Sequence, residues 1–88
     1  MTASALVKLY GTPWCGHSAW VRRALEQAGI SHQWIDISRD PEAAAWVESV
    51  SAGQQRVPVL LFPDGDILVE PSPAVLNAKL AGMEGGGR

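Results

Sequence analysis

Residues 11–18, which read Gly-Thr-Pro-Trp-Cys-Gly-His-Ser, constrain the fold of this chain more than any other segment. They lie between a short apolar run over residues 6–10 and a stretch with helical periodicity. The chain must therefore turn here from a strand into a helix, and Cys15, its only cysteine, stands where that helix begins. The macrodipole and the free N–H groups of a helix N-terminus stabilise a thiolate, the nucleophilic form of cysteine. The segment predicts a reactive thiol rather than an inert, packed one.

Alternation, helical spacing and turn residues divide the rest of the chain into further elements. Asp40 with Pro41, and Ser72 with Pro73, each combine an N-cap residue with a proline at the first helical position, which predicts two helix starts. Residues 63–66 predict a tight turn between two strands. The expected order is a strand over residues 6–10, a helix over 16–28, a strand over 31–37, a helix from Pro41, strands over 57–62 and 67–69, and a helix from Pro73 to about Leu80.

Length, composition and charge set the broad class of the protein. With 88 residues, 47% hydrophobic and 18% charged, the chain fits one small globular domain. We expect this domain over residues 1–82 and a disordered tail over residues 83–88. The formal net charge of −2 and the absence of a basic stripe argue against a nucleic-acid partner. No apolar stretch approaches the roughly 18 residues of a membrane span, and no secretory pattern opens the chain, so we expect a cytoplasmic monomer that does not bind membranes.

The sequence gives little support for a metal site. A single cysteine cannot form an internal disulfide or an all-cysteine metal site within one chain. Zinc held by Cys15, His17 and His32 is conceivable, but their spacing matches no ligand pattern. We therefore expect no metal and no bound cofactor.

The element order, with a cysteine between the first strand and the first helix and a proline opening the third strand, resembles the thioredoxin fold in its glutaredoxin form. The resemblance covers residues 5–81 and implies an α/β protein with a four-stranded mixed sheet flanked by three helices. Within this superfamily the chain is similar to the mycoredoxins. The similar segments are residues 14–18 (Trp-Cys-Gly-His-Ser), residues 52–58 (Ala-Gly-Gln-Gln-Arg-Val-Pro), Asp64-Gly65 and Pro71-Ser72.

The resemblance implies a thiol–disulfide oxidoreductase that reduces mixed disulfides between proteins and a low-molecular-weight thiol. That thiol is mycothiol for mycoredoxins and glutathione for glutaredoxins, and it would be a cosubstrate rather than a bound cofactor. Glu70 and Pro71 stand where many glutathione-using glutaredoxins have two glycines, so mycothiol is favoured. The expected partners are S-thiolated proteins and small thiols.

The same resemblance assigns roles around Cys15, which would be the nucleophile. A cis Pro58 would face the cysteine, and the backbone of Val57 would bind the substrate like an added strand. The alternative is an ordinary trans proline at the start of an edge strand. Trp14 would offer a flat apolar surface to partners, with ordinary packing as the alternative. His17 would line the thiol pocket or tune Cys15, unless it is an exposed residue without a role.

Two further residues are candidates for binding the small thiol. Ser72 could hold a carboxylate through the free N–H groups of a helix N-terminus, although helix capping alone explains a serine there. Arg56 could pair with an anionic substrate, or it could be a solvated loop charge.

Ser18 stands three residues after Cys15, where dithiol redoxins carry their resolving cysteine. Monothiol glutaredoxins carry Cys-Gly-Phe-Ser, from which residues 15–18 differ only at His17. Two interpretations stay open: a natural monothiol enzyme, or a Cys-to-Ser variant of a dithiol redoxin. The alternative functions are an iron–sulfur cluster carrier of the monothiol glutaredoxin type and, if position 18 is natively cysteine, an electron donor reduced by thioredoxin reductase.

Overall fold

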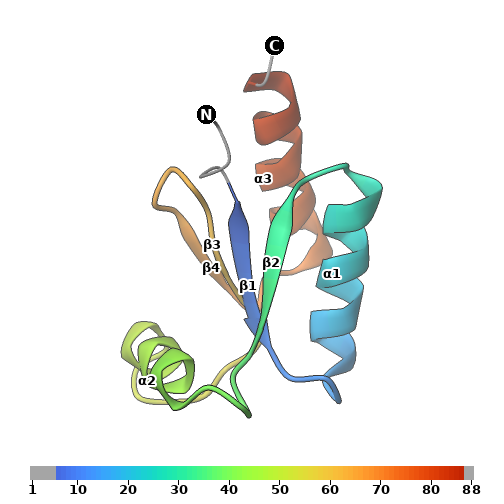
Figure 1. The fold of residues 1–88 in the computed structure, drawn as a ribbon. Helices are drawn as coiled ribbons and strands as arrows, with labels where there is room; N and C mark the ends of the chain where they lie inside the picture. The colour runs from blue at the N-terminus through green and yellow to red at the C-terminus, as the bar shows by residue number, and fades with distance from the viewer. Residues whose placement is uncertain (1–5, 87–88) are drawn as a thin grey trace.

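The computed structural model describes residues 6–86, with side chains described as far as residue 82. Figure 1 shows its elements, and their order and type confirm those predicted from the sequence. They are β1 (Val7–Gly11), α1 (Gly16–Gln27), β2 (His32–Asp36), α2 (Pro41–Val50), β3 (Val59–Leu61), β4 (Ile67–Val69) and α3 (Pro73–Gly86).

The strands form one mixed sheet in the order β2-β1-β3-β4. β2 runs parallel to β1, as expected for strands joined by a crossover helix. β3 is antiparallel to β1, and β4 is antiparallel to β3 across the predicted tight turn. α1 and α3 lie on one face of the sheet and α2 lies on the other (Figure 1). The expected fold class, four mixed strands flanked by three helices, is confirmed.

Each face of the sheet has its own buried core. Leu9 and Tyr10 are neighbours on β1 but belong to different cores, because successive side chains of a strand point to opposite faces. Packing on both faces holds β1 in place, and with it the start of the loop that leads to Cys15. The core beneath α1 and α3 contains Val7, Leu9, Val21, Leu25, Leu60, Phe62, Leu76 and Leu80. The core beneath α2 contains Tyr10, Ile37, Ala43, Val47 and Val59.

The predicted cap of α2 is confirmed, because the Asp40 carboxylate accepts the N–H of Ala43 at 3.1 Å. Farther along the chain, the Lys79 ammonium of α3 lies 2.7 Å from the Asp64 carboxylate and 2.6 Å from that of Asp66. These contacts join α3 to the turn between β3 and β4.

Two element ends differ from the prediction. β3 begins at Val59 rather than at residue 57, because Pro58 has no N–H to donate to a ladder. α3 continues to Gly86 instead of ending near Leu80. Glycine disfavours helix only by about 1 kcal/mol per residue, and extending a formed helix adds a hydrogen bond for each residue fixed. The backbone of residues 83–86 is thus helical, while residues 87–88 of the predicted tail lie outside the described residues. Among the described helices, none is both long and apolar enough to cross a membrane.

Candidate active site

Cys15 is the N-cap residue of α1. Its backbone is extended (φ −89°, ψ 114°), and its Sγ accepts the N–H of Ser18 at 3.4 Å. A turn after β1 prepares this geometry, because the N–H of Cys15 donates to the carbonyl of Thr12 at 3.2 Å. The predicted location of Cys15 at the start of a helix is confirmed, and its sulfur takes the place that the side-chain oxygen of an N-cap residue usually occupies.

Opposing effects act on the acidity of Cys15. Partial burial raises the pKa of the thiol, but the nearby Ser18 hydroxyl and the N–H groups of Ser18 and His17 lower it. The Glu70 carboxylate raises it again, because a nearby negative charge disfavours the thiolate. The net result is a pKa below the ordinary value for cysteine. This is the environment of a reactive cysteine rather than of a structural one.

Ser18 is completely buried at the first turn of α1. Its hydroxyl has no hydrogen-bond partner of acceptable geometry among the described residues, although it lies close enough to the sulfur of Cys15 to lower the pKa of the thiol. A Cβ placed on Gly11 would lie only 2.5 Å from the Ser18 Oγ and 3.0 Å from Trp34. Gly11 therefore permits the close approach of α1 to β1. The sequence marked Gly11 only as the end of a strand and gave no sign of this contact.

The loop before α3 meets the start of α1 through His17. The Nε2 atom of His17 lies 2.9 Å from the carbonyl oxygen of Pro71, 54 positions away in the chain. The backbone N–H of His17 helps to lower the pKa of Cys15. The predicted role of its imidazole at the thiol stays a prediction.

Glu70 is a site residue that the sequence pattern did not single out as one. Its φ of +47° lies in the left-handed region that favours glycine. Its N–H donates to the carbonyl of Pro58 at 2.8 Å, and its carboxylate lies 3.3 Å from the Arg56 guanidinium. The sequence did hint at a special backbone at Glu70, because this residue stands where similar proteins often carry glycine. Arg56 is also held by Gln54, at 3.0 Å, so its charge is already paired.

The peptide bond between Val57 and Pro58 is cis, as the resemblance implied. Pro58 is fully buried at the start of β3. Among the backbone hydrogen bonds of the described residues, none involves the N–H or the carbonyl of Val57. Both groups can therefore bond to an incoming extended chain.

Trp14 and Ser72 complete the set of predicted site residues. The Trp14 side chain is 74% exposed, so its ring is not packed in either core. Ser72 caps α3, because its Oγ accepts the N–H of Val75 at 3.3 Å.

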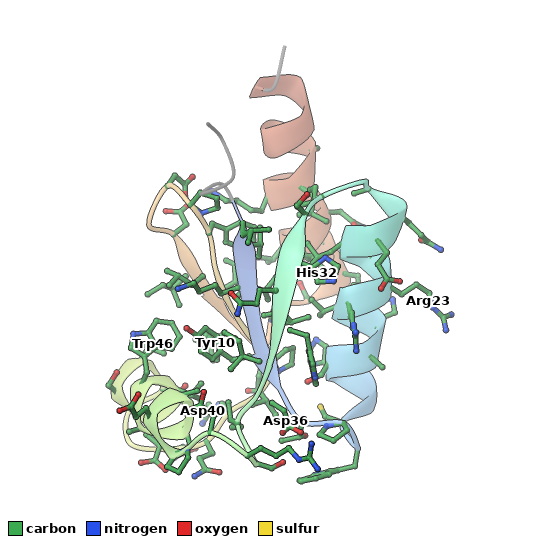
Figure 2. The ribbon with its side chains drawn as sticks, viewed as in Figure 1. Tyr10, Arg23, His32, Asp36, Asp40 and Trp46 are labelled. Atoms are coloured by element: carbon green, nitrogen blue, oxygen red, sulfur yellow. The ribbon has the colours of Figure 1, made fainter. Side chains whose placement is uncertain are left out.

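His32 does not lie beside Cys15 and His17. His32 pairs with Val7 at the beginning of β1, whereas Cys15 follows the end of that strand. Figure 2 shows His32 and Asp36 at opposite ends of β2. Within the described part of the chain, no group of three or more His, Cys, Asp and Glu side chains is arranged to hold a metal ion.

Comparison with known proteins agrees with this geometry. The glutaredoxin family profile matches residues 7–67. A protein of Mycobacterium tuberculosis named as a glutaredoxin is 35% identical over 82 residues, which cover 93% of this chain and 98% of the relative. Mycoredoxin 1 of Corynebacterium glutamicum is 32% identical over 77 residues, covering 88% and 95%.

The fold itself occurs in a glutaredoxin from Archaeoglobus fulgidus, which superposes with a TM-score of 0.72 at 23% identity and covers 88% of this chain and 87% of its own. The family match, the two relatives and the N-cap thiol all indicate one kind of protein. This chain belongs to the glutaredoxin family of thiol–disulfide oxidoreductases.

Proposed function

We propose that the protein reduces mixed disulfides between proteins and mycothiol by a monothiol mechanism with Cys15 as the nucleophile. The observation that carries this proposal is the position of the Cys15 Sγ, which accepts a helix N-terminal N–H and has a lowered pKa. Ser18, three residues later, cannot form a disulfide with it.

The exchange has two balanced steps. The Cys15 thiolate attacks the mycothiol sulfur of a protein–mycothiol disulfide, and the protein thiolate leaves and takes up a proton. Cys15 is then joined to mycothiol. The thiolate of a second mycothiol attacks the mycothiol sulfur of this adduct, which releases Cys15 as a thiolate and forms the mycothiol disulfide. Each step exchanges one disulfide for another and needs no other oxidant or reductant.

The protein part of the substrate would meet Trp14 and Val57. The exposed ring of Trp14 adjoins Cys15 in the chain and offers an apolar contact. The unpaired backbone groups of Val57 suit an extended segment of the substrate, which would bind as an added strand next to the buried Pro58.

The charges beside the thiol favour mycothiol over glutathione. Glutathione carries two carboxylates, whereas mycothiol carries none. The Glu70 carboxylate is close enough to Cys15 to raise the pKa of its thiol, and it also holds the Arg56 guanidinium that an anionic thiol would need. At Ser72, the other candidate for binding a carboxylate, the serine hydroxyl already accepts the N–H of Val75, one of the N–H groups at the start of α3 that a carboxylate would use. A neutral sugar-linked thiol therefore encounters less repulsion here than glutathione does.

The choice of thiol can be tested with one peptide prepared as a mycothiol and as a glutathione mixed disulfide. Mass spectrometry should show one small thiol added to Cys15, with faster transfer from the mycothiol form and no adduct on Cys15→Ala. In Glu70→Gln, the ratio of the two transfer rates should move toward glutathione. Because both rates depend on the same Cys15, the ratio cancels any change in its reactivity. A wild-type ratio that favours glutathione would rule out mycothiol as the preferred thiol.

The monothiol mechanism has a separate test. The adduct on Cys15 should persist until free mycothiol is added, because the chain has no second thiol. In Ser18→Cys the adduct should be released without added thiol as an internal disulfide forms. Release of the small thiol from the wild-type adduct in the absence of free thiol would contradict the mechanism.

A further inference from the structure

The imidazole of His17 is directed at the loop that precedes α3. Its Nε2 atom lies 2.9 Å from the carbonyl oxygen of Pro71. Because a carbonyl oxygen can only accept, Nε2 must carry the proton in this contact. Pro71 is buried, and among the described residues the His17 ring is the only hydrogen-bond partner of its carbonyl. A buried carbonyl normally has a partner, and here the imidazole supplies it.

A second contact restricts the same ring. The ring centroids of His17 and Trp20, which follows three residues later on α1, lie 6.2 Å apart, with 57° between the ring planes. This tilted arrangement lies within the range that aromatic pairs prefer. Contact with Trp20 and the bond to Pro71 together restrict the imidazole, so that it joins α1 to the loop before α3.

The loop that this ring holds carries Glu70, the residue directly before Pro71. The φ of Glu70 is +47°, a conformation that costs a residue other than glycine free energy and persists only where the surroundings hold it. The Glu70 N–H donates to the carbonyl of Pro58 at 2.8 Å, and its carboxylate lies 3.3 Å from the exposed guanidinium of Arg56. The bond to the Pro71 carbonyl is a third restraint. Of the three, it alone comes from α1, the helix that begins at the reactive cysteine.

We propose that His17 is a positioning residue for the thiol exchange, because its imidazole holds the carbonyl of Pro71 and thereby keeps the Glu70 carboxylate beside Cys15. The imidazole acts on the loop and not on the sulfur. This inference rests on the proposed function for the role of Cys15, but not for the identity of the small thiol.

The two ways in which His17 could act predict opposite changes at Cys15. The Glu70 carboxylate raises the pKa of the thiol, so a loop released from His17 should leave that pKa lower. An imidazole that acted on the sulfur through a positive charge of its own would lower the pKa, and its removal would raise it. The direction of the change therefore separates a positioning role from a direct one.

The experiment titrates Cys15 by thiolate absorbance in the full chain, without any disulfide substrate. His17→Phe keeps an aromatic ring next to Trp20 and the backbone N–H of residue 17, but removes the donor to Pro71. Its Cys15 pKa should fall by no more than it does in Glu70→Gln, because release of the loop can at most remove the whole effect of the carboxylate. His17→Gln retains a neutral N–H donor and should restore the wild-type titration.

A double variant shows whether His17 acts through Glu70. In His17→Phe/Glu70→Gln the titration of Cys15 should match that of Glu70→Gln alone, because no carboxylate is left to release. His32→Phe is the matched control. The Nδ1 atom of His32 also lies near a backbone carbonyl, that of Ile30 at 3.1 Å, but at the opposite end of β1 from Cys15. This control should leave the titration of Cys15 unchanged.

A higher or unchanged Cys15 pKa in His17→Phe, or an equal shift with and without the Glu70 carboxylate, would overturn the proposal. Thermal unfolding shows that each variant is folded during the titration, and His17→Ala replaces the phenylalanine variant, with the same expectations, if that variant is not. Because the titration involves no small thiol, its outcome is independent of the transfer assays that test the proposed function.

Discussion

Replacing Ser18 by alanine should stabilise the protein and at the same time make Cys15 a weaker acid. Ser18 is fully buried, and its hydroxyl has no partner of good geometry in the described structure. Removing the hydroxyl therefore removes the cost of desolvating it. The same hydroxyl helps to lower the pKa of Cys15, so its loss moves that pKa upward. The substitution should therefore raise the stability of the protein and lower the acidity of Cys15, and the two changes can be measured separately.

The size of the stability change follows from two terms. A buried polar group without a partner costs about 1–3 kcal/mol. The space left by the missing oxygen destabilises the protein by about 0.5–1.5 kcal/mol, the cost of deleting a buried group of similar size, and offsets part of this gain. The net expectation is a stabilisation of about 1 kcal/mol, which raises the Tm of a domain of this size by roughly 4–8 °C.

The change in the pKa of Cys15 also alters how the stability of the protein depends on pH. The folded-state pKa of Cys15 lies below its ordinary value, so the thiolate stabilises the reduced protein above the unfolded-state pKa. This contribution is lost as the pH falls through the folded-state pKa. In Ser18→Ala the folded-state pKa is higher, so the pH window of this gain narrows and the gain itself becomes smaller.

Thermal unfolding of the reduced protein, followed by circular dichroism at several pH values, measures both effects, and thiolate absorbance titrates Cys15 directly. Ser51→Ala is the matched control, because the Ser51 hydroxyl is also buried without a partner but belongs to the C-cap of α2. It should raise the Tm similarly and leave the titration of Cys15 unchanged. If Ser18→Ala lowers the Tm while Ser51→Ala raises it, the Ser18 hydroxyl makes a favourable bond and the reasoning is refuted. An unchanged pKa of Cys15 in Ser18→Ala would refute the predicted effect of the Ser18 hydroxyl on the thiol.

Two further substitutions test the surroundings of the thiol. Glu70→Gln removes the carboxylate that raises the pKa of Cys15, so the pH profile of iodoacetamide alkylation should move to lower pH, and a profile that moves to higher pH would contradict the assignment. Gly11→Ala places a Cβ 2.5 Å from the Ser18 Oγ and should destabilise the protein by about 1–3 kcal/mol in urea unfolding. Combined with Ser18→Ala this cost should shrink, whereas strictly additive effects would show that the two residues do not compete for the same space.

The sequence predicted those features that depend on a few consecutive residues. The location of Cys15 at the start of a helix, the Asp40 cap of α2 and the turn over residues 63–66 each have a local chemical cause, and each is present. The parallel pairing of β1 and β2 also followed from local order, because the crossover through α1 leaves little alternative. The expected cis bond before Pro58 came from resemblance rather than from local chemistry.

Contacts between segments that are distant in the chain could not be predicted from a few consecutive residues. Glu70 affects Cys15 across 55 positions only because the loop before α3 passes the start of α1, and no periodicity encodes that passage. The contact of Gly11 with Ser18 depends on how closely one helix approaches one strand. Tyr10 and Trp46 meet because α2 crosses the opposite face of β1. Such contacts are set by the packing of whole elements, and the sequence shows only the elements.

The lack of a second cysteine changes what the environment of Cys15 must accomplish in the proposed cycle. In a dithiol enzyme an internal thiol ejects the adduct, but here Cys15 must itself be a good leaving group when a second small thiol attacks. A thiol with a lower pKa leaves faster, yet its thiolate is a weaker nucleophile in the first step. The N–H of Ser18 at the sulfur favours departure, and the Glu70 carboxylate limits how far the pKa falls. The opposing effects at the start of α1 therefore suit a cysteine that must both attack and leave.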